Sequence, residues 1–80
     1  MASVELIFDM DEARVTVNAE YNGMWEEWEV EVVAADLFDD EGNFLRTIEG
    51  EEAEAFHHRN FWLIEALTEK AYDKKFGGEE

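Results

Sequence analysis

The sequence predicts an α+β domain: a three- to four-stranded antiparallel β-sheet, connected as a meander, with one long C-terminal α-helix packed on one face. Three observations predict this class. Through roughly the first half of the 80 residues, apolar and polar residues alternate with the period of a half-buried strand. From about residue 51 the apolar residues recur at helical spacing instead. Turn-forming clusters separate these segments, and the length suits a single domain over residues 1–80.

The first two strands are predicted at residues 3–9 and 14–21, joined by a turn at residues 10–13. Asn22-Gly23 follows the second strand directly. Because both residues tolerate a positive φ, this pair predicts a tight type I′ turn, which joins twisted antiparallel strands.

A third, longer strand is predicted at residues 25–38. Trp25 lies on the same parity as the glutamates of this strand, which predicts either a bulge near Glu26-Glu27 or a tryptophan that faces solvent. The residues expected on the core-facing side of the strand are Trp28, Val30, Val32 and Ala34.

The remaining segments complete the domain. Residues 44–48 form either a short edge strand or an extended lead-in, after the turn cluster at residues 39–43. One helix is predicted at about residues 51–75, with a kink as an option near residues 57–60. Its expected core stripe is Ala53, Phe56, Asn60, Leu63, Ile64, Leu67 and Ala71.

The acidic charge is concentrated in one part of the chain. Residues 1–55 carry 17 Asp and Glu against two Arg, whereas residues 56–80 carry five acids against four bases. A one-sided negative field attracts cationic partners and repels nucleic acid and anionic membranes, so we expect neither direct nucleic-acid binding nor membrane binding. With no cysteine and no long apolar run, the expected protein is soluble and cytoplasmic.

Three carboxylates, those of Glu27, Glu29 and Glu31, are expected on one side of the third strand. Alternate residues of a strand stand about 7 Å apart, which resembles the spacing of phosphates along one nucleic-acid strand. A plain solvated sheet face and a salt-adapted surface are the alternatives, but residues 20–54 hold 13 acids and a single base. The candidate partner-binding residues are Glu20, Trp25, Glu26, Glu27, Glu29, Glu31, Asp36, Asp39, Asp40 and Glu41.

Catalytic and metal-binding patterns are missing from the sequence. There is no phosphate-binding glycine loop and no nucleophile elbow, so we expect no enzyme, no catalytic residue and no cofactor. Glu54 and His57 have the one-turn spacing of di-iron helices, but such sites need two motifs on facing helices. The acidic turn lacks the ligand pattern of an EF-hand, so we expect no metal site.

Several aromatic side chains are expected off the core-facing sides of their elements. Such residues suit either the edge of a core or an interface, where Trp and Tyr often carry much of the binding energy. They are Trp25, Phe61, Trp62 and Tyr72.

In size, charge and layout the chain resembles small acidic proteins of bacteriophages and mobile elements, of the anti-CRISPR or DNA-mimic type. The Asn22-Gly23 hairpin, the glutamate row, the turn at residues 39–43 and the closing helix carry this resemblance. The resemblance implies an inhibitor, acting in the host cytoplasm, that occupies a Lys/Arg-rich groove of a host nucleic-acid-binding protein. The alternative is a phage structural or assembly module, as a monomer or homodimer, whose charge maintains solubility.

Overall fold

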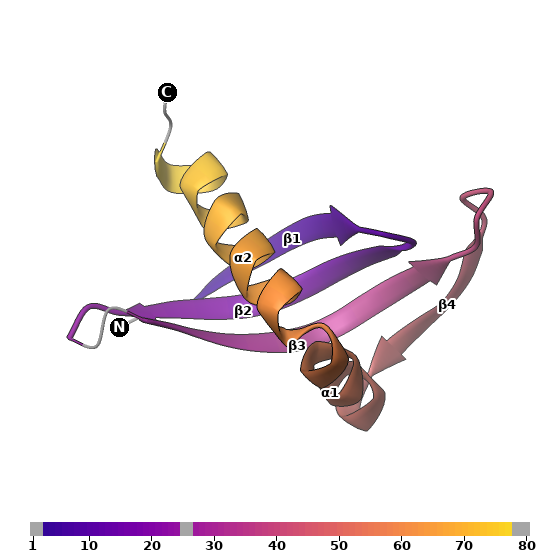
Figure 1. Cartoon of the computed structure of the whole chain (residues 1–80), viewed down its shortest axis with the longest axis horizontal. Coiled ribbons are helices and arrows are strands. Elements are labelled where there is room, and N and C mark those ends of the chain that lie inside the picture. Colours follow the sequence, from indigo (N-terminus) through magenta and orange to yellow (C-terminus); the bar gives the residue numbers. More distant parts are fainter. Residues whose placement is uncertain (1–2, 25–26, 78–80) are drawn as a thin grey trace.

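The computed structural model describes residues 3–24 and 27–77, and its architecture is an open antiparallel sheet with helices on one face (Figure 1). The sheet order is β1-β2-β3-β4, so the expected meander and α+β class are confirmed, and residues 44–48 belong to a true strand. The elements are β1 Val4–Met10, β2 Ala13–Asn22, β3 Glu27–Phe38, β4 Phe44–Glu49, α1 Gly50–Arg59, α2 Phe61–Tyr72 and a π-helical turn, η1 Asp73–Gly77.

The alternation in β1 and β2 builds the core. Val15 and Val17 of β2 are fully buried, and their β1 partners across the ladder are Phe8 and Leu6. Successive residues of a strand point to opposite faces, so the odd-numbered residues of β2 lie under the helices. The buried core is completed by Leu6, Ala13, Ala19, Val32, Ala35, Ile48, Ala53, Phe56 and Ile64.

A β-bulge at Val33 changes which face the second half of β3 presents. Val32 pairs with Val17 and Ala34 pairs with Thr16, so Val33 is an extra residue without a partner in the β2–β3 register. The expected core position of Ala34 is therefore wrong, because Ala35 takes that place and is 1% exposed. The extra residue inverts the alternation, which keeps both halves of this long strand packed on the helices.

The β2–β3 hairpin is wider than the sequence predicts. Asn22 pairs with Glu27 and so belongs to the ladder, which means that the prediction of a two-residue type I′ turn at Asn22-Gly23 is wrong. This register places Trp28 opposite Tyr21, and the two rings meet with centroids 5.1 Å apart. The predictions for Trp25 and for a bulge near Glu26 lie outside the described residues.

The prediction of a single long helix is also wrong, because Asn60 separates α1 from α2. Asn60 leaves helical geometry at φ −121° and ψ 28°, and its side-chain Nδ2 donates to the carbonyl of Phe56 at 3.0 Å. An asparagine side chain that bonds its own backbone competes with the helical ladder. The break changes the phase of the apolar stripe: Ile64 is buried, whereas Leu63 is 46% exposed, against its expected place in the core.

Both helices cover the same face of the sheet and leave the other face open. Helix α1 packs on β3 and β4, and α2 crosses β1 and β3 (Figure 1). Gly50 makes the turn from β4 into α1 with φ +59°, a left-handed conformation that glycine adopts without strain. Within the described residues, no helix has both the length and the apolar character needed to cross a bilayer.

Candidate functional site

The open side of the sheet carries the predicted glutamates at its β2–β3 hairpin end. In the β2–β3 register Glu29 lies opposite Glu20, and Glu31 lies opposite Asn18. Because the partner residues of a ladder project to the same face, these side chains form one surface on the side away from the helices. We call this surface the acidic face, and its members are Glu5, Glu20, Glu27, Glu29 and Glu31.

The acidic face brings like charges close together. Glu20 and Glu29 are directly opposite like charges, an arrangement that destabilises a ladder pair. Carboxylates about 7 Å apart repel by about 0.6 kcal/mol in water before salt screening. Among the described residues, Arg14 is the only Lys or Arg on the open side, and its Nε donates to Asp9 Oδ1 at 3.0 Å. Arg14 is thus bonded to a carboxylate outside the acidic face.

Asp36 does not extend the acidic face, although the sequence groups it with those residues. Its Oδ1 accepts a hydrogen bond from Thr47 Oγ1 at 2.6 Å, and its ladder partner on β2 is Arg14. A neutral row that includes Thr16 and Ala34 separates it from Glu31. The predicted continuous ribbon of charge is thus divided into two regions.

The second region is the turn between β3 and β4, where Asp39 organises the backbone. Its Oδ1 accepts from the amides of Glu41 and Asn43 at 2.9 and 2.8 Å, and its Oδ2 accepts from Asn43 Nδ2 at 3.2 Å. These hydrogen bonds, with Asn43 the largest contributor, lower the pKa of Asp39. Asp39 therefore has a structural role in the turn, and Asp40 and Glu41 are the exposed carboxylates beside it.

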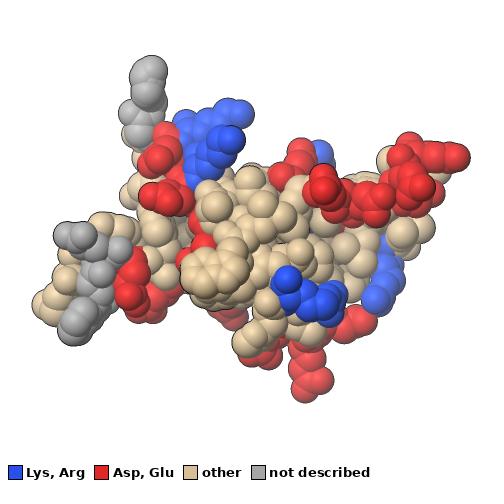
Figure 2. Space-filling model, in the orientation of Figure 1, with Lys and Arg blue, Asp and Glu red and all other residues tan. Residues whose placement is uncertain are grey.

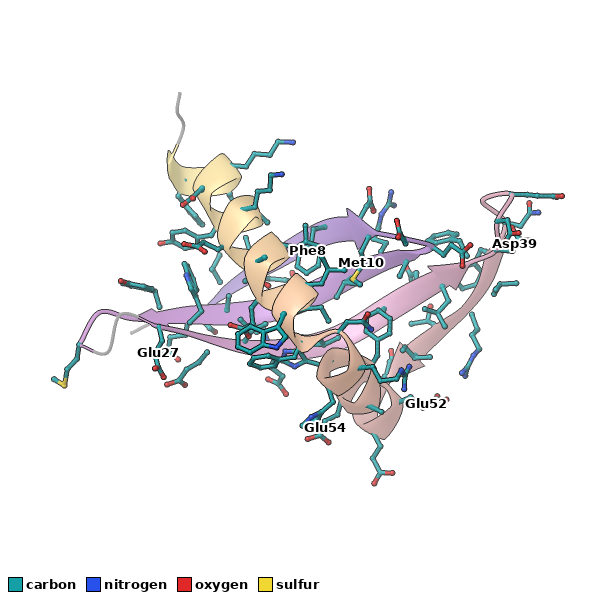
Figure 3. All side chains as sticks on the ribbon, viewed as in Figure 1. Phe8, Met10, Glu27, Asp39, Glu52 and Glu54 are labelled. Carbon is teal, nitrogen blue, oxygen red and sulfur yellow. The ribbon has the colours of Figure 1, made fainter. Side chains whose placement is uncertain are left out.

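The fold brings Glu12 against this turn, a contact that the sequence analysis missed. The amide of Phe38 donates to the carbonyl of Glu12 at 2.9 Å, which ties the β1–β2 turn to the end of β3. The charge of Asp40 and its hydrogen bond with Glu12 raise the pKa of the Glu12 carboxyl. Figure 3 shows Asp39 at the opposite end of the sheet from Glu27. We call this second region the acidic end: Glu12, Asp39, Asp40 and Glu41.

These two pKa shifts predict opposite effects of pH on stability. The pKa of Glu12 is raised on folding, so its contribution is favourable below its unfolded pKa and is lost as the pH rises through its folded pKa. Glu12→Gln should therefore raise the melting temperature at pH 7 and leave it unchanged near pH 3. Circular dichroism melts at both pH values measure this.

Asp39→Asn is the matched variant, and its expected effect on the melting temperature at pH 7 has the opposite sign. The pKa of Asp39 is lowered on folding, so its stabilisation is present above its unfolded pKa and is lost as the pH falls through its folded pKa. Asp39→Asn should lower the melting temperature at pH 7 and lose this effect in acid. If Glu12→Gln also raises the melting temperature at pH 3, charge repulsion is not the cause of the gain.

His57 of α1 lies beside Glu65 of α2. His57 Nε2 lies 3.8 Å from Glu65 Oε2. Burial, together with the neighbouring His58, lowers the pKa of His57, and burial raises the pKa of Glu65. Both shifts disfavour an ion pair between the two groups. No group of three or more potential metal ligands occurs within residues 3–24 and 27–77.

The aromatic residues expected off the core divide into two sets. Tyr72 packs against Trp28 with ring centroids 4.6 Å apart and is half-buried, so it belongs to the edge of the core. Trp62 is 83% exposed and Phe61 is 43% exposed, and their rings contact each other at 5.2 Å. On the helix side neutral side chains fill the centre and acidic ones lie around the margin (Figure 2).

The structure thus brings together four of the predicted site residues, Glu20, Glu27, Glu29 and Glu31, and separates them from Asp36 and from the acidic end. Trp25 and Glu26 lie outside the described residues. The arrangement offers carboxylate oxygens from neighbouring strands on one open side of the sheet, which suits cationic groups. Glu5 was missed, although its place on the polar parity of the first strand was a usable signal.

Comparison of the chain with protein-family models, with curated protein sequences and with solved structures finds no significant match in any of the three. What the protein binds must therefore be inferred from its own geometry and charge.

Proposed function

We propose that this is a non-enzymatic inhibitor of the phage-encoded DNA-mimic or anti-CRISPR type, which occupies a basic nucleic-acid-binding groove on a host protein complex. The observation that carries the proposal is the acidic face: five carboxylates on one open sheet surface, where Arg14, the one Lys or Arg of the described residues on that side, is already bonded to Asp9. A groove built for nucleic acid presents Lys and Arg that recognise anionic oxygens and release counterions when neutralised.

The packing behind the acidic face supports this role. The glutamates stand on three paired strands, β1, β2 and β3, of a sheet whose opposite side is packed against two helices, so their spacing is held by the ladder. A preorganised row of charges loses less entropy on binding than the same charges on a flexible loop. The charge also steers the encounter, which accelerates association at low salt.

The acidic end adds a second contact region for a partner large enough to reach both ends of the sheet. Asp40 and Glu41 are exposed at the tip of the β3–β4 turn, which the hydrogen bonds of Asp39 hold in place. In this proposal the acidic face makes the main contact and the acidic end sets the orientation of the bound protein.

A pull-down from a lysate of the native host tests the proposal. Immobilised protein should retain nucleic-acid-binding proteins at low salt, and excess duplex DNA should release them because both ligands use the same groove. Retention that duplex DNA leaves unchanged would contradict the proposal.

A second candidate is a structural or assembly module that binds through α2. The exposed Phe61, Trp62 and Leu63 favour it, because large apolar side chains at the surface are typical of interfaces. Light scattering across salt concentrations separates the two candidates. A hydrophobic homodimer persists at high salt, whereas a charge-driven complex dissociates.

A further inference from the structure

The edge of β3 from Glu27 to Val33 is open. Strand β2 pairs along most of β3, but β4 pairs only with residues 34–38, and no other strand within the described residues reaches the remaining seven (Figure 1). The cause is local: β4 ends at Glu49, and Gly50 with φ +59° turns the chain away into α1. The sheet therefore has a gap beside β3 where β4 would otherwise continue.

An open edge is a binding template, because alternate residues direct their N–H and C=O groups away from the neighbouring strand. The seven-residue edge is about 23 Å long, enough to pair with a short extended segment. A partner strand that fills such a gap gains main-chain hydrogen bonds, and its alternate side chains supply specificity.

The space beside this edge is a groove of about 620 Å³ lined by both apolar and acidic side chains. Val30, Val32 and Val33 of β3 supply apolar groups. Glu31 and two residues of α1, Glu51 and Glu54, provide negative charge along the groove. The groove therefore presents apolar and acidic groups to one extended segment.

The other two outer edges are less suitable for a cationic strand. Beside β1, Lys75 Nζ donates to the carbonyl of Glu5 at 3.4 Å, and Lys74 and Lys75 line the adjacent groove. The outer strand β4 has an irregular register at Leu45 and carries Arg46. Bulges and inward-facing cations are features that disfavour pairing with further strands, particularly strands that carry positive charge.

We propose that the Glu27–Val33 edge binds an extended segment of a partner protein in which Lys or Arg alternates with apolar residues. When such a strand pairs with β3, its basic side chains lie beside Glu27, Glu29 and Glu31, and its apolar side chains lie on the helix side, beside Val30 and Val32. A second copy of this chain is disfavoured, because it would place rows of glutamate beside each other.

This inference goes beyond the proposed function, because strand pairing depends on the backbone of β3 and does not require the partner to bind nucleic acid. The probe is a capped seven-residue peptide of alternating lysine and valine. Two further forms have the same side chains but are N-methylated, one at every lysine and the other at every valine. A peptide of alternating glutamate and valine is the charge control.

Strand pairing predicts that one N-methylated form binds like the parent, while the other loses at least tenfold in affinity by calorimetry, since only one set of amides faces β3. Hydrogen exchange should show new protection within residues 27–33 and none in β1, and the glutamate peptide should not bind.

Three results would overturn the proposal: equal binding of both N-methylated forms, protection located at β1 or β4, or no binding of the parent peptide at low salt. None of these results bears on the DNA competition in the pull-down, so the two proposals can fail separately.

Discussion

Reversing Glu29 and Glu31 together to lysine should reduce affinity for the basic partner by about a hundredfold or more. Both residues belong to the acidic face and are exposed. Loss of close charge pairs at an interface costs about 3 kcal/mol or more in total, and each factor of ten in Kd corresponds to about 1.4 kcal/mol. Surface plasmon resonance against the captured partner measures the change.

The fold should tolerate this double substitution. A lysine at position 29 lies opposite Glu20, so a like-charge ladder pair becomes an attractive one. The melting temperature should therefore be equal to or above that of the parent. A parallel fall in melting temperature and affinity would attribute the loss of binding to unfolding instead.

The matched control reverses Glu69 and Asp73, two exposed acids of α2 and η1, and so changes the net charge by the same amount on the helix side. If the position of the charge matters, this variant binds within about threefold of the parent, since steering by net charge alone is a modest effect at physiological salt. Equal losses in both variants would mean that total charge, rather than the acidic face, determines binding.

Truncating Ile64 to alanine should have the largest effect on stability. Ile64 belongs to α2 and its side chain is fully buried. Removal of a large buried aliphatic group lowers the free energy of unfolding by about 2–5 kcal/mol. A domain of this size has about 5–10 kcal/mol of stability in total. We expect the melting temperature to fall by roughly 10 °C or more. Urea titration followed by circular dichroism measures the change in the free energy of unfolding.

Leu63→Ala is the neighbouring control, because Leu63 has a similar side chain but is 46% exposed. This substitution should lower the free energy of unfolding by less than about 1 kcal/mol, as is usual for surface positions. The pair tests the break at Asn60 directly, since one continuous helix with the predicted stripe would bury both residues. Similar losses for both variants would contradict the observed phase of α2.

Local patterns were sufficient to predict most of the sheet. The alternation around Val15 and Val17 predicted β1 and β2 and their buried side, and the change of period near residue 51 predicted the start of the helical region. These signals depend only on neighbours in the chain. The side on which the glutamates of β3 lie followed from the same parity.

The errors arose where tertiary contacts outweighed local preference. The bulge at Val33 cannot be seen in the sequence, because the apolar residues around it are compatible with either parity. The break at Asn60 depends on a side-chain bond to Phe56, although the optional kink was predicted near that position. The wider hairpin follows from the register that pairs Asn22 with Glu27.

The candidate site was predicted only in part, because sequence patterns group residues of one strand but do not show which distant turns meet. Residues on one strand were grouped correctly, whereas contacts between distant turns were missed. The pairing of Glu12 with Asp40 needs the whole meander to bring the two turns together. Asp36 was assigned to the site because its partners, Thr47 and Arg14, lie on other strands and could not be read from its neighbours.

If the acidic face substitutes for nucleic acid, it should compete with DNA for the same groove, and a displacement assay measures this competition. A nucleic-acid-binding protein recovered from the host is loaded with fluorescently labelled duplex DNA, and the anisotropy is followed as this protein is added. We predict that the parent protein displaces the DNA and that Glu29→Lys/Glu31→Lys does not. A ternary complex that holds the DNA and this protein together would contradict the account.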